Sequence, residues 1–156
     1  MWKYESYDFE NISLHDHVVD EIRLDGKDIL LVFKEGFDIV KTHALNNTGK
    51  SKQTTSAQMI LKDGNLIKGT VLRYVGAERQ GTEEKIDLVW LLNFAHGIEV
   101  HSFGIKEGVF FLYSHEILYD DKVDFLTLEI SCSQVLFCWG DYSSDAWFEG
   151  WPNRAE

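Results

Sequence analysis

Apolar and polar residues alternate with a period of two along much of this chain. The stretch FLTLEI at 125–130 shows the pattern most clearly, because Leu126, Leu128 and Ile130 share one side and the residues between them share the other. Such alternation is typical of a half-buried β-strand. Turn signals built from Gly and Asp interrupt the pattern at short intervals, as in antiparallel β structure. The pattern predicts strands at nine ranges, which are 17–24, 28–34, 37–42, 56–62, 65–75, 98–103, 108–114, 123–131 and 134–140.

These ranges predict a mainly β fold. We interpret it as a single-domain antiparallel β-sandwich or open barrel of about nine strands, spanning residues 1–156. Residues 84–95, EKIDLVWLLNFA, are the exception, because Leu88, Leu91 and Leu92 follow the helical spacing i, i+3, i+4. We predict one short helix there, although IDLVWLL would also fit a buried strand.

Two polar segments are expected to connect these elements. Residues 43–55, HALNNTGKSKQTT, have almost no apolar content and are long enough for a functional loop. Residues 76–85, GAERQGTEEK, are the second such connection.

The clearest hairpin begins near the N-terminus, where HVVDEIRL is followed by the turn LDGKD and the strand DILLVFK. A positive φ is expected at the glycine of this turn. A period of two places Val18, Ile22 and Leu24 on the core face and His17 on the solvent face. Asp16 has the core parity, so we expect it at the strand end, with its carboxylate bonded to backbone amides.

The polar face of this hairpin also allows a metal site. His15, His17 and Glu21 share one parity, and imidazoles with a carboxylate are ligands for a divalent transition metal. Their spacing is similar to half of the first cupin motif. The glycine that opens that motif is replaced by Phe9, and the Pro-x-Gly of the second motif is missing, since the only proline is Pro152. A cupin-like metal-dependent enzyme is therefore the alternative hypothesis, and the preferred one has exposed histidines and no cofactor.

The composition narrows the choice of partners. The formal net charge is -11, distributed as ten acids and four bases in residues 1–40, four and eight in 41–85, and twelve and three in 86–156. Phosphate binding needs a basic face, so we expect no nucleic-acid partner and no anionic membrane partner. The acidic surface either only keeps the chain in solution or faces a basic protein partner.

Several sequence features favour a cytoplasmic protein without classical catalytic motifs. The chain has no secretory segment and no apolar run of membrane-spanning length. Cys132 and Cys138 lie about 20 Å apart if they are on one strand, too far for a disulfide, so we expect free thiols. Neither a G-x-S-x-G nor a phosphate-binding G-x-x-x-x-G-K-[ST] motif occurs.

The C-terminal segment LFCWGDYSSDAWFEGW at 136–151 is rich in aromatic residues. Aromatic side chains dominate core burial, so the segment is expected to close the core, and we expect Trp147 to be part of it. The alternative is a partner surface, because Trp and Tyr are frequent in binding hot spots. The candidate binding residues are Trp139, Tyr142, Trp147 and Trp151.

Three segments together resemble a known group of proteins. They are LHDHVVDEIRLDGKDILLVF, LVWLLNFAHGIEVHSF and CWGDYSSDAWFEGW. The group consists of small, mostly-β bacterial proteins of unknown role that share a Leu-His-Asp opening hairpin, a Trp-Leu-Leu helix and an Ala-Trp-aromatic C-terminal motif. The residues that carry the resemblance are Leu14, His15, Asp16, Trp90, Leu91, Leu92, Trp139, Tyr142, Ala146 and Trp147.

The resemblance implies a cytoplasmic, non-enzymatic protein and no active site. Some members of the group are similar to immunity or accessory proteins of toxin systems. We therefore expect a binding or interaction protein, in its most concrete form an immunity-type inhibitor of a basic partner.

Overall fold

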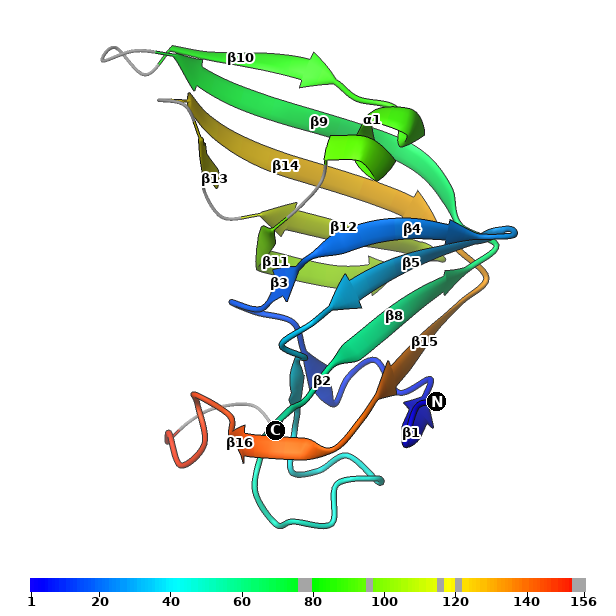
Figure 1. Cartoon of the computed structure of the whole chain (residues 1–156), viewed down its shortest axis with the longest axis vertical. Helices are drawn as coiled ribbons and strands as arrows, with labels where there is room; N and C mark the ends of the chain where they lie inside the picture. The colour runs from blue at the N-terminus through cyan, green and yellow to red at the C-terminus, as the bar shows by residue number, and fades with distance from the viewer. Residues whose placement is uncertain (76–79, 95–96, 115–116, 120–121, 153–156) are drawn as a thin grey trace.

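The computed structural model describes residues 1–75, 80–94, 97–114, 117–119 and 122–152 (Figure 1). This part of the chain is mainly β, as predicted, with one short helix. The elements are β1 Tyr4–Ser6, β2 Ile12–Ser13, β3 Val18–Val19, β4 Glu21–Asp25, β5 Asp28–Phe33, β6 Asp38–Ile39, β7 Lys52–Thr54, β8 Ala57–Lys62, β9 Asn65–Val75, β10 Gln80–Lys85, α1 Leu88–Phe94, β11 Ile98–Lys106, β12 Val109–Ser114, β13 Ile117–Tyr119, β14 Lys122–Ser131, β15 Gln134–Trp139 and β16 Tyr142–Asp145.

A five-stranded antiparallel sheet forms one layer of the fold, with the order β1-β15-β8-β5-β4. Burial alternates along its central strands, so every second side chain of β5 and β8 is buried. Because paired residues of neighbouring strands point to the same face, the alternation builds one continuous apolar surface. It is formed by Ile22, Ile29, Leu31, Phe33, Ala57, Met59, Leu61, Val135, Phe137 and Trp139.

A larger antiparallel sheet forms the second layer, in the order β10-β9-β14-β12-β11-β3, with β13 paired to β14. Leu126, Leu128 and Ile130 are buried, as the alternation in FLTLEI predicted. The buried residues of both sheets belong to one hydrophobic cluster, and Leu91 of α1, which is fully buried, joins it. The arrangement is that of a β-sandwich, and the described strands do not close into a barrel.

A third sheet, β16-β7-β6-β2, lies at the opposite end of the molecule from α1 (Figure 1). It continues the first layer, because β6, β7 and β16 follow or precede β5, β8 and β15 after short bends and keep the same neighbours. Gly36 allows one of these bends: its φ is +76°, and a Cβ there would overlap Thr54 and the Thr55 carbonyl oxygen.

The nine predicted strands all have a counterpart, but several boundaries were wrong. The predicted strand 17–24 is divided into β3 and β4, and the predicted helix 84–95 is shortened to α1. The expected loop 43–55 contains β7. The polar segment 76–85 contains β10, and positions 76–79 of that segment lie outside the described residues. Strand β10 is the edge of its sheet, and its side chains from 82 to 85 are exposed, so no apolar alternation marks it.

The described helix is short. Within the described ranges, no helix is long and apolar enough to cross a membrane. Cys132 and Cys138 are both free thiols, as predicted, and burial raises the pKa of the Cys138 thiol to about 11. At neutral pH the thiol of Cys138, a buried residue of β15, is therefore protonated and unreactive.

Candidate functional site: an exposed histidine–tryptophan patch

The first hairpin does not follow the single register that its period of two predicted. Strand β3 pairs with β11 in the larger sheet, whereas β4 pairs with β5 in the five-stranded sheet, so the chain changes layer at Asp20. The Asp20 carboxylate accepts a hydrogen bond from the Lys34 amide at 2.7 Å. The predictions that Val18 and Leu24 face the core were therefore wrong. Val19 is fully buried in place of Val18, and Leu24 is 47% exposed. The prediction for Ile22 is confirmed, since only 3% of it is exposed.

His17 was predicted to face solvent, and this prediction was wrong. The residue is only 9% exposed, and its Nε2 lies 2.8 Å from Oδ2 of Asp38, a fully buried residue of β6. The two atoms form an ion-pair contact without the alignment of a hydrogen bond, and Asp38 Oδ1 has no hydrogen-bond partner among the described residues. A buried polar side chain needs a polar partner, and the His17 imidazole is the polar group that faces Asp38 at close range.

The three residues of the metal hypothesis have separate partners. His15 Nδ1 lies 2.6 Å from the backbone oxygen of His101, while His17 contacts Asp38. Glu21 faces Arg23 at 3.8 Å. Among the described residues, no group of three or more His, Cys, Asp or Glu side chains is placed to hold a metal ion.

The aromatic C-terminal segment is divided between the core and the surface. Trp139 is fully buried, stacks on Tyr4 at 5.5 Å and meets the edge of His43 at 5.4 Å. Tyr142 is half-buried and donates its hydroxyl to the Leu45 carbonyl at 2.8 Å. Of the four aromatic binding candidates, Trp139 therefore belongs to the interior and Tyr142 is fixed beside it.

Trp147 and Trp151 lie on the surface, with exposed fractions of 37% and 53%. The prediction that Trp147 belongs to the core was therefore wrong. Ala146 and Phe148 take the inward positions of this turn and pack with Val40 in a small cluster of their own. The alternation of apolar and polar residues could not predict which of Trp147 and Phe148 is buried. These two residues follow the end of β16 and are not part of a strand, so no period of two applies to them.

One of the exposed tryptophans, Trp147, meets His15, which in turn lies beside His101. The ring centroids of His15 and Trp147 are 5.8 Å apart, and those of His15 and His101 are 6.0 Å apart. Trp147 and Trp151 are 5.1 Å apart with ring planes at 89°. We call this surface the histidine–tryptophan patch, and it consists of His15, His101, Trp147 and Trp151. It joins the turn before β3, strand β11 and the C-terminal turn, which are far apart in the sequence.

Local geometry fixes the two histidines of the patch. The turn that carries His15 is closed by a hydrogen bond from the His17 amide to the Leu14 carbonyl at 3.0 Å. Asp16, with φ of 65°, donates its amide to the Val100 carbonyl on β11 at 2.8 Å, next to His101. Because a carbonyl oxygen only accepts, the contact with His101 places a proton on His15 Nδ1. His15 Nε2 then faces the Asp16 carboxylate at 3.4 Å.

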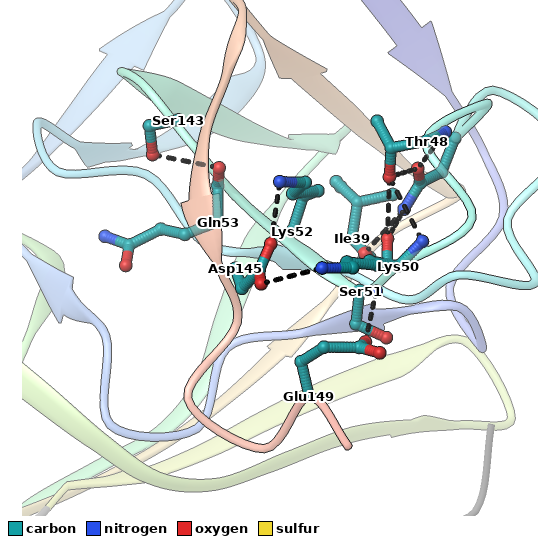
Figure 2. A network of polar contacts seen from close by, with 10 residues as sticks. Ile39, Thr48, Lys50, Ser51, Lys52, Gln53, Ser143, Asp145 and Glu149 are labelled. Carbon is teal, nitrogen blue, oxygen red and sulfur yellow. Dashed lines mark hydrogen bonds and ion pairs between the residues drawn. The ribbon is translucent and has the colours of Figure 1, made fainter.

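The C-terminal turn that carries the tryptophans is held by a polar network (Figure 2). The Ala146 amide donates to the Ser51 carbonyl at 2.9 Å, and the Ser51 amide donates to the Glu149 carboxylate at 2.5 Å. Asp145 pairs with Lys52 at 2.7 Å and with Lys50 at 3.6 Å, and its hydrogen bond to Lys52 lowers its pKa. These contacts give the exposed tryptophans a fixed support.

The polar segment 43–55, which contacts the C-terminal turn through Ser51, is ordered by the buried side-chain amide of Asn46. Asn46 is 6% exposed, and its Nδ2 donates to the carbonyl oxygens of Ile39 and Lys50 at 3.0 and 2.9 Å. Its Oδ1 accepts from the Thr48 amide at 3.1 Å and from the Thr48 hydroxyl at 2.8 Å. The polar segment 43–55, which the sequence left as a candidate functional loop, therefore has an internal hydrogen-bond frame that supports the C-terminal turn.

Sequence reasoning missed His101 and the pairing of His17 with Asp38. His101 is separated from His15 by most of the chain, and only the position of β11 beside β3 brings them together. The one signal in the sequence was the alternation of Glu99 and His101 with buried Ile98 and Val100, which marks both polar residues as exposed. The chain matches no protein-family model, no curated protein and no solved structure in the comparisons made.

Proposed function

We propose that this chain is a non-enzymatic binding protein that contacts a basic protein partner through the histidine–tryptophan patch. One observation carries the proposal: Trp147 and Trp151 are exposed, yet the turn that bears them is anchored by ion pairs and backbone hydrogen bonds. Exposed large aromatic rings on a fixed support are the usual anchors of a binding surface, because little side-chain entropy is lost when a partner covers them.

The charge of the protein supports a basic partner. The net charge is -11, and two acidic side chains lie by the patch: Asp16 contacts the His15 imidazole, and Glu99 is exposed two residues before His101. Complementary charge accelerates encounter and suppresses the wrong partners, while aromatic rings supply the buried area. An immunity-type inhibitor that covers a basic surface of a toxin is the most concrete form of this function.

A cytoplasmic site of action fits the two thiols. Cys132 and Cys138 are both free thiols, and burial raises the pKa of both. Free buried thiols are ordinary in a reducing compartment. We therefore propose that the partner is met in the cytoplasm.

The proposal is tested by capture of partners from the native host. The wild-type chain, immobilised through a C-terminal tag, is compared with the double variant Trp147→Ala/Trp151→Ala at about 50 mM and about 500 mM salt. A basic protein should be retained by the wild type at low salt, weakly at high salt, and not by the double variant. The matched control is Val89→Ala, an exposed apolar position (66%) on α1, at the far end of the molecule (Figure 1).

Two results would contradict the proposal. If the double variant retains the same protein as the wild type, the patch is not the contact surface. If the retained protein is acidic, or its retention does not change with salt, the charge argument fails. Urea unfolding of each variant, measured beforehand, confirms that lost capture is not lost folding.

A further inference from the structure

His43 lies where three separate parts of the chain meet. The residue is 3% exposed, and its ring meets that of Trp139 in β15 at a centroid distance of 5.4 Å, with the planes at 88°. Its Nε2 lies 3.1 Å from the Ser6 hydroxyl at the end of β1, and its Nδ1 accepts a hydrogen bond from the Leu45 amide at 3.0 Å. The Leu45 carbonyl in turn accepts the Tyr142 hydroxyl of β16 at 2.8 Å. One ring therefore connects β1, its own turn and, through Leu45, β16.

These contacts require a neutral imidazole. An amide N–H only donates, so Nδ1 carries no proton, and the single ring proton is on Nε2, which donates to the Ser6 hydroxyl. The same hydroxyl oxygen accepts a hydrogen bond from the Asp8 amide at 3.0 Å. A second ring proton would place two donors, Nδ1 and the Leu45 amide, against each other in a buried site. The folded position of His43 is therefore compatible with only one of its two charge states.

The charged groups around the imidazole do not remove this conflict. Burial lowers the pKa of His43, and the Asp8 carboxylate opposes that effect only in part. Tyr4 and Tyr142, the titratable residues of β1 and β16 in this aromatic cluster, are phenols and bring no carboxylate. Glu5 of β1 is exposed and is paired in register with Cys138, on the other face of the sheet from Trp139. The folded structure therefore holds the neutral form of the ring.

We propose that His43 is an acid-triggered switch: when its ring takes a second proton, β1 and the turn at 43–46 separate from Trp139 while the other strands remain paired. The separation is local, because β1 is an edge strand of three residues that pairs only with β15 in the described part of the chain. Short edge elements open at a smaller free-energy cost than central strands. In the open form the imidazole reaches water and carries its charge without a facing donor. The opening exposes the Trp139 ring, which is fully buried in the closed form.

The test is amide hydrogen exchange of the full chain, followed by NMR from about pH 7.5 to about pH 5. The intrinsic rate of an unprotected amide at the same pH, divided by each measured rate, gives a protection factor. Protection of the Leu45 amide should fall by about 3- to 30-fold over this range, because the open form takes a proton with the ordinary histidine pKa of about 6.5 and the closed form takes it less readily. Protection of the Leu128 amide, in a central strand of the larger sheet, should fall by a smaller factor.

Two variants and one control assign the effect to His43. His43→Asn keeps a side-chain acceptor for the Leu45 amide two residues on but does not titrate, so its Leu45 protection should change by less than about twofold. Asp8→Asn removes the carboxylate that favours the charged ring, so the closed form takes a proton less readily and Leu45 protection should fall further than in the wild type. His101→Gln, the matched control, removes an exposed imidazole of β11 and should behave as the wild type.

Equal falls at Leu45 and Leu128 would overturn the inference, because the acid effect would then be global unfolding. A fall at Leu45 that persists in His43→Asn would reject it as well, because another group would then be responsible. Should His43→Asn not fold, Asp8→Asn decides, since a fall equal to or smaller than that of the wild type contradicts the switch. The measurement needs no partner, so its result is independent of the capture experiment.

Discussion

Two tryptophans only a few residues apart, Trp139 and Trp147, have opposite environments. Trp139 is in β15, between β1 and β8, and is covered by Tyr4 and His43. Trp147 follows β16, the edge of its sheet, and is 37% exposed. The difference shows that residue type alone does not decide between core and surface. A strand with a neighbour on both sides buries its inward side chain, whereas a turn after an edge strand can present one.

The same contrast exists between two histidines of the opening turn. His17 is buried and paired with Asp38, whereas His15 is in contact with the exposed Trp147. His17 and Trp139 therefore belong to the interior, whereas His15 and Trp147 belong to the patch. Substitutions of the buried and the exposed residue of each pair test this comparison. We expect them to change the free energy of unfolding by different amounts.

The largest effect is expected at Trp139. Trp139→Ala should lower the free energy of unfolding by about 3–5 kcal/mol, because it leaves a cavity between Tyr4, Phe37 and His43. Trp147→Ala should change it by less than about 1 kcal/mol. Urea unfolding of the two variants measures the difference, and equal losses would show that the segment is not divided between core and surface.

His17→Ala is expected to destabilise by about 1–3 kcal/mol, because it leaves the buried Asp38 side chain without the imidazole that faces it. The double variant His17→Ala/Asp38→Ala should recover part of that loss. His15→Ala, whose contacts are on the surface, is the matched control and should cost under about 1 kcal/mol. If the loss of unfolding free energy in the double variant equals the sum of the losses in His17→Ala and Asp38→Ala, the two residues do not interact, and the pairing is contradicted.

His43, which covers Trp139, makes the interior sensitive to acid. Burial lowers the pKa of His43, and its ring holds the neutral form, since Nδ1 accepts from the Leu45 amide at 3.0 Å. A histidine whose folded pKa is below its unfolded value of about 6.5 contributes stability that is present above that value. The contribution is lost as the pH falls through the folded pKa.

Stability should therefore decrease from about pH 7.5 to about pH 5 in the wild type and decrease less in His43→Gln. Urea unfolding at several pH values compares the two slopes, which removes the contribution of the carboxylates common to both chains. Parallel slopes would mean that His43 takes no part in the acid sensitivity.

A smaller effect is expected at Asp16, which supports the patch. Its φ of 65° is strained for an alanine, so Asp16→Ala should cost about 1–2 kcal/mol. Asp16→Gly should be nearly neutral, because glycine adopts this conformation without strain. Thermal unfolding of the two variants is the measurement. Should the glycine variant lose as much as the alanine variant, the carboxylate and not the backbone would be the stabilising feature.

The period of two predicted most of the fold because burial on one face of a strand is a local property. It predicted the inward face of β14 and the hairpin of β4 and β5, whose turn has Gly26 at φ of +60°. It failed where the chain changes sheet, as at Asp20, because the parity of one strand does not continue into a strand of another layer.

The candidate site depended on contacts that no local pattern contains. The aromatic segment and the His15 turn were both noticed in the sequence, but for different hypotheses, and only the folded chain places Trp147 beside His15. The partner of His17 is on β6, in the third sheet. Long-range pairs of this kind follow from the sheet topology, which the sequence pattern leaves open.

The most direct test of the division between core and surface is the solvent accessibility of each tryptophan. The chain is labelled with 5-fluorotryptophan, each fluorine signal is assigned by single Trp→Phe variants, and a soluble paramagnetic reagent is added. The account predicts strong broadening of the Trp147 and Trp151 signals and little broadening of the Trp139 signal, in line with exposed fractions of 37%, 53% and 0%. Protection of Trp147 and Trp151 equal to that of Trp139 would contradict it, because the patch would then not be a surface.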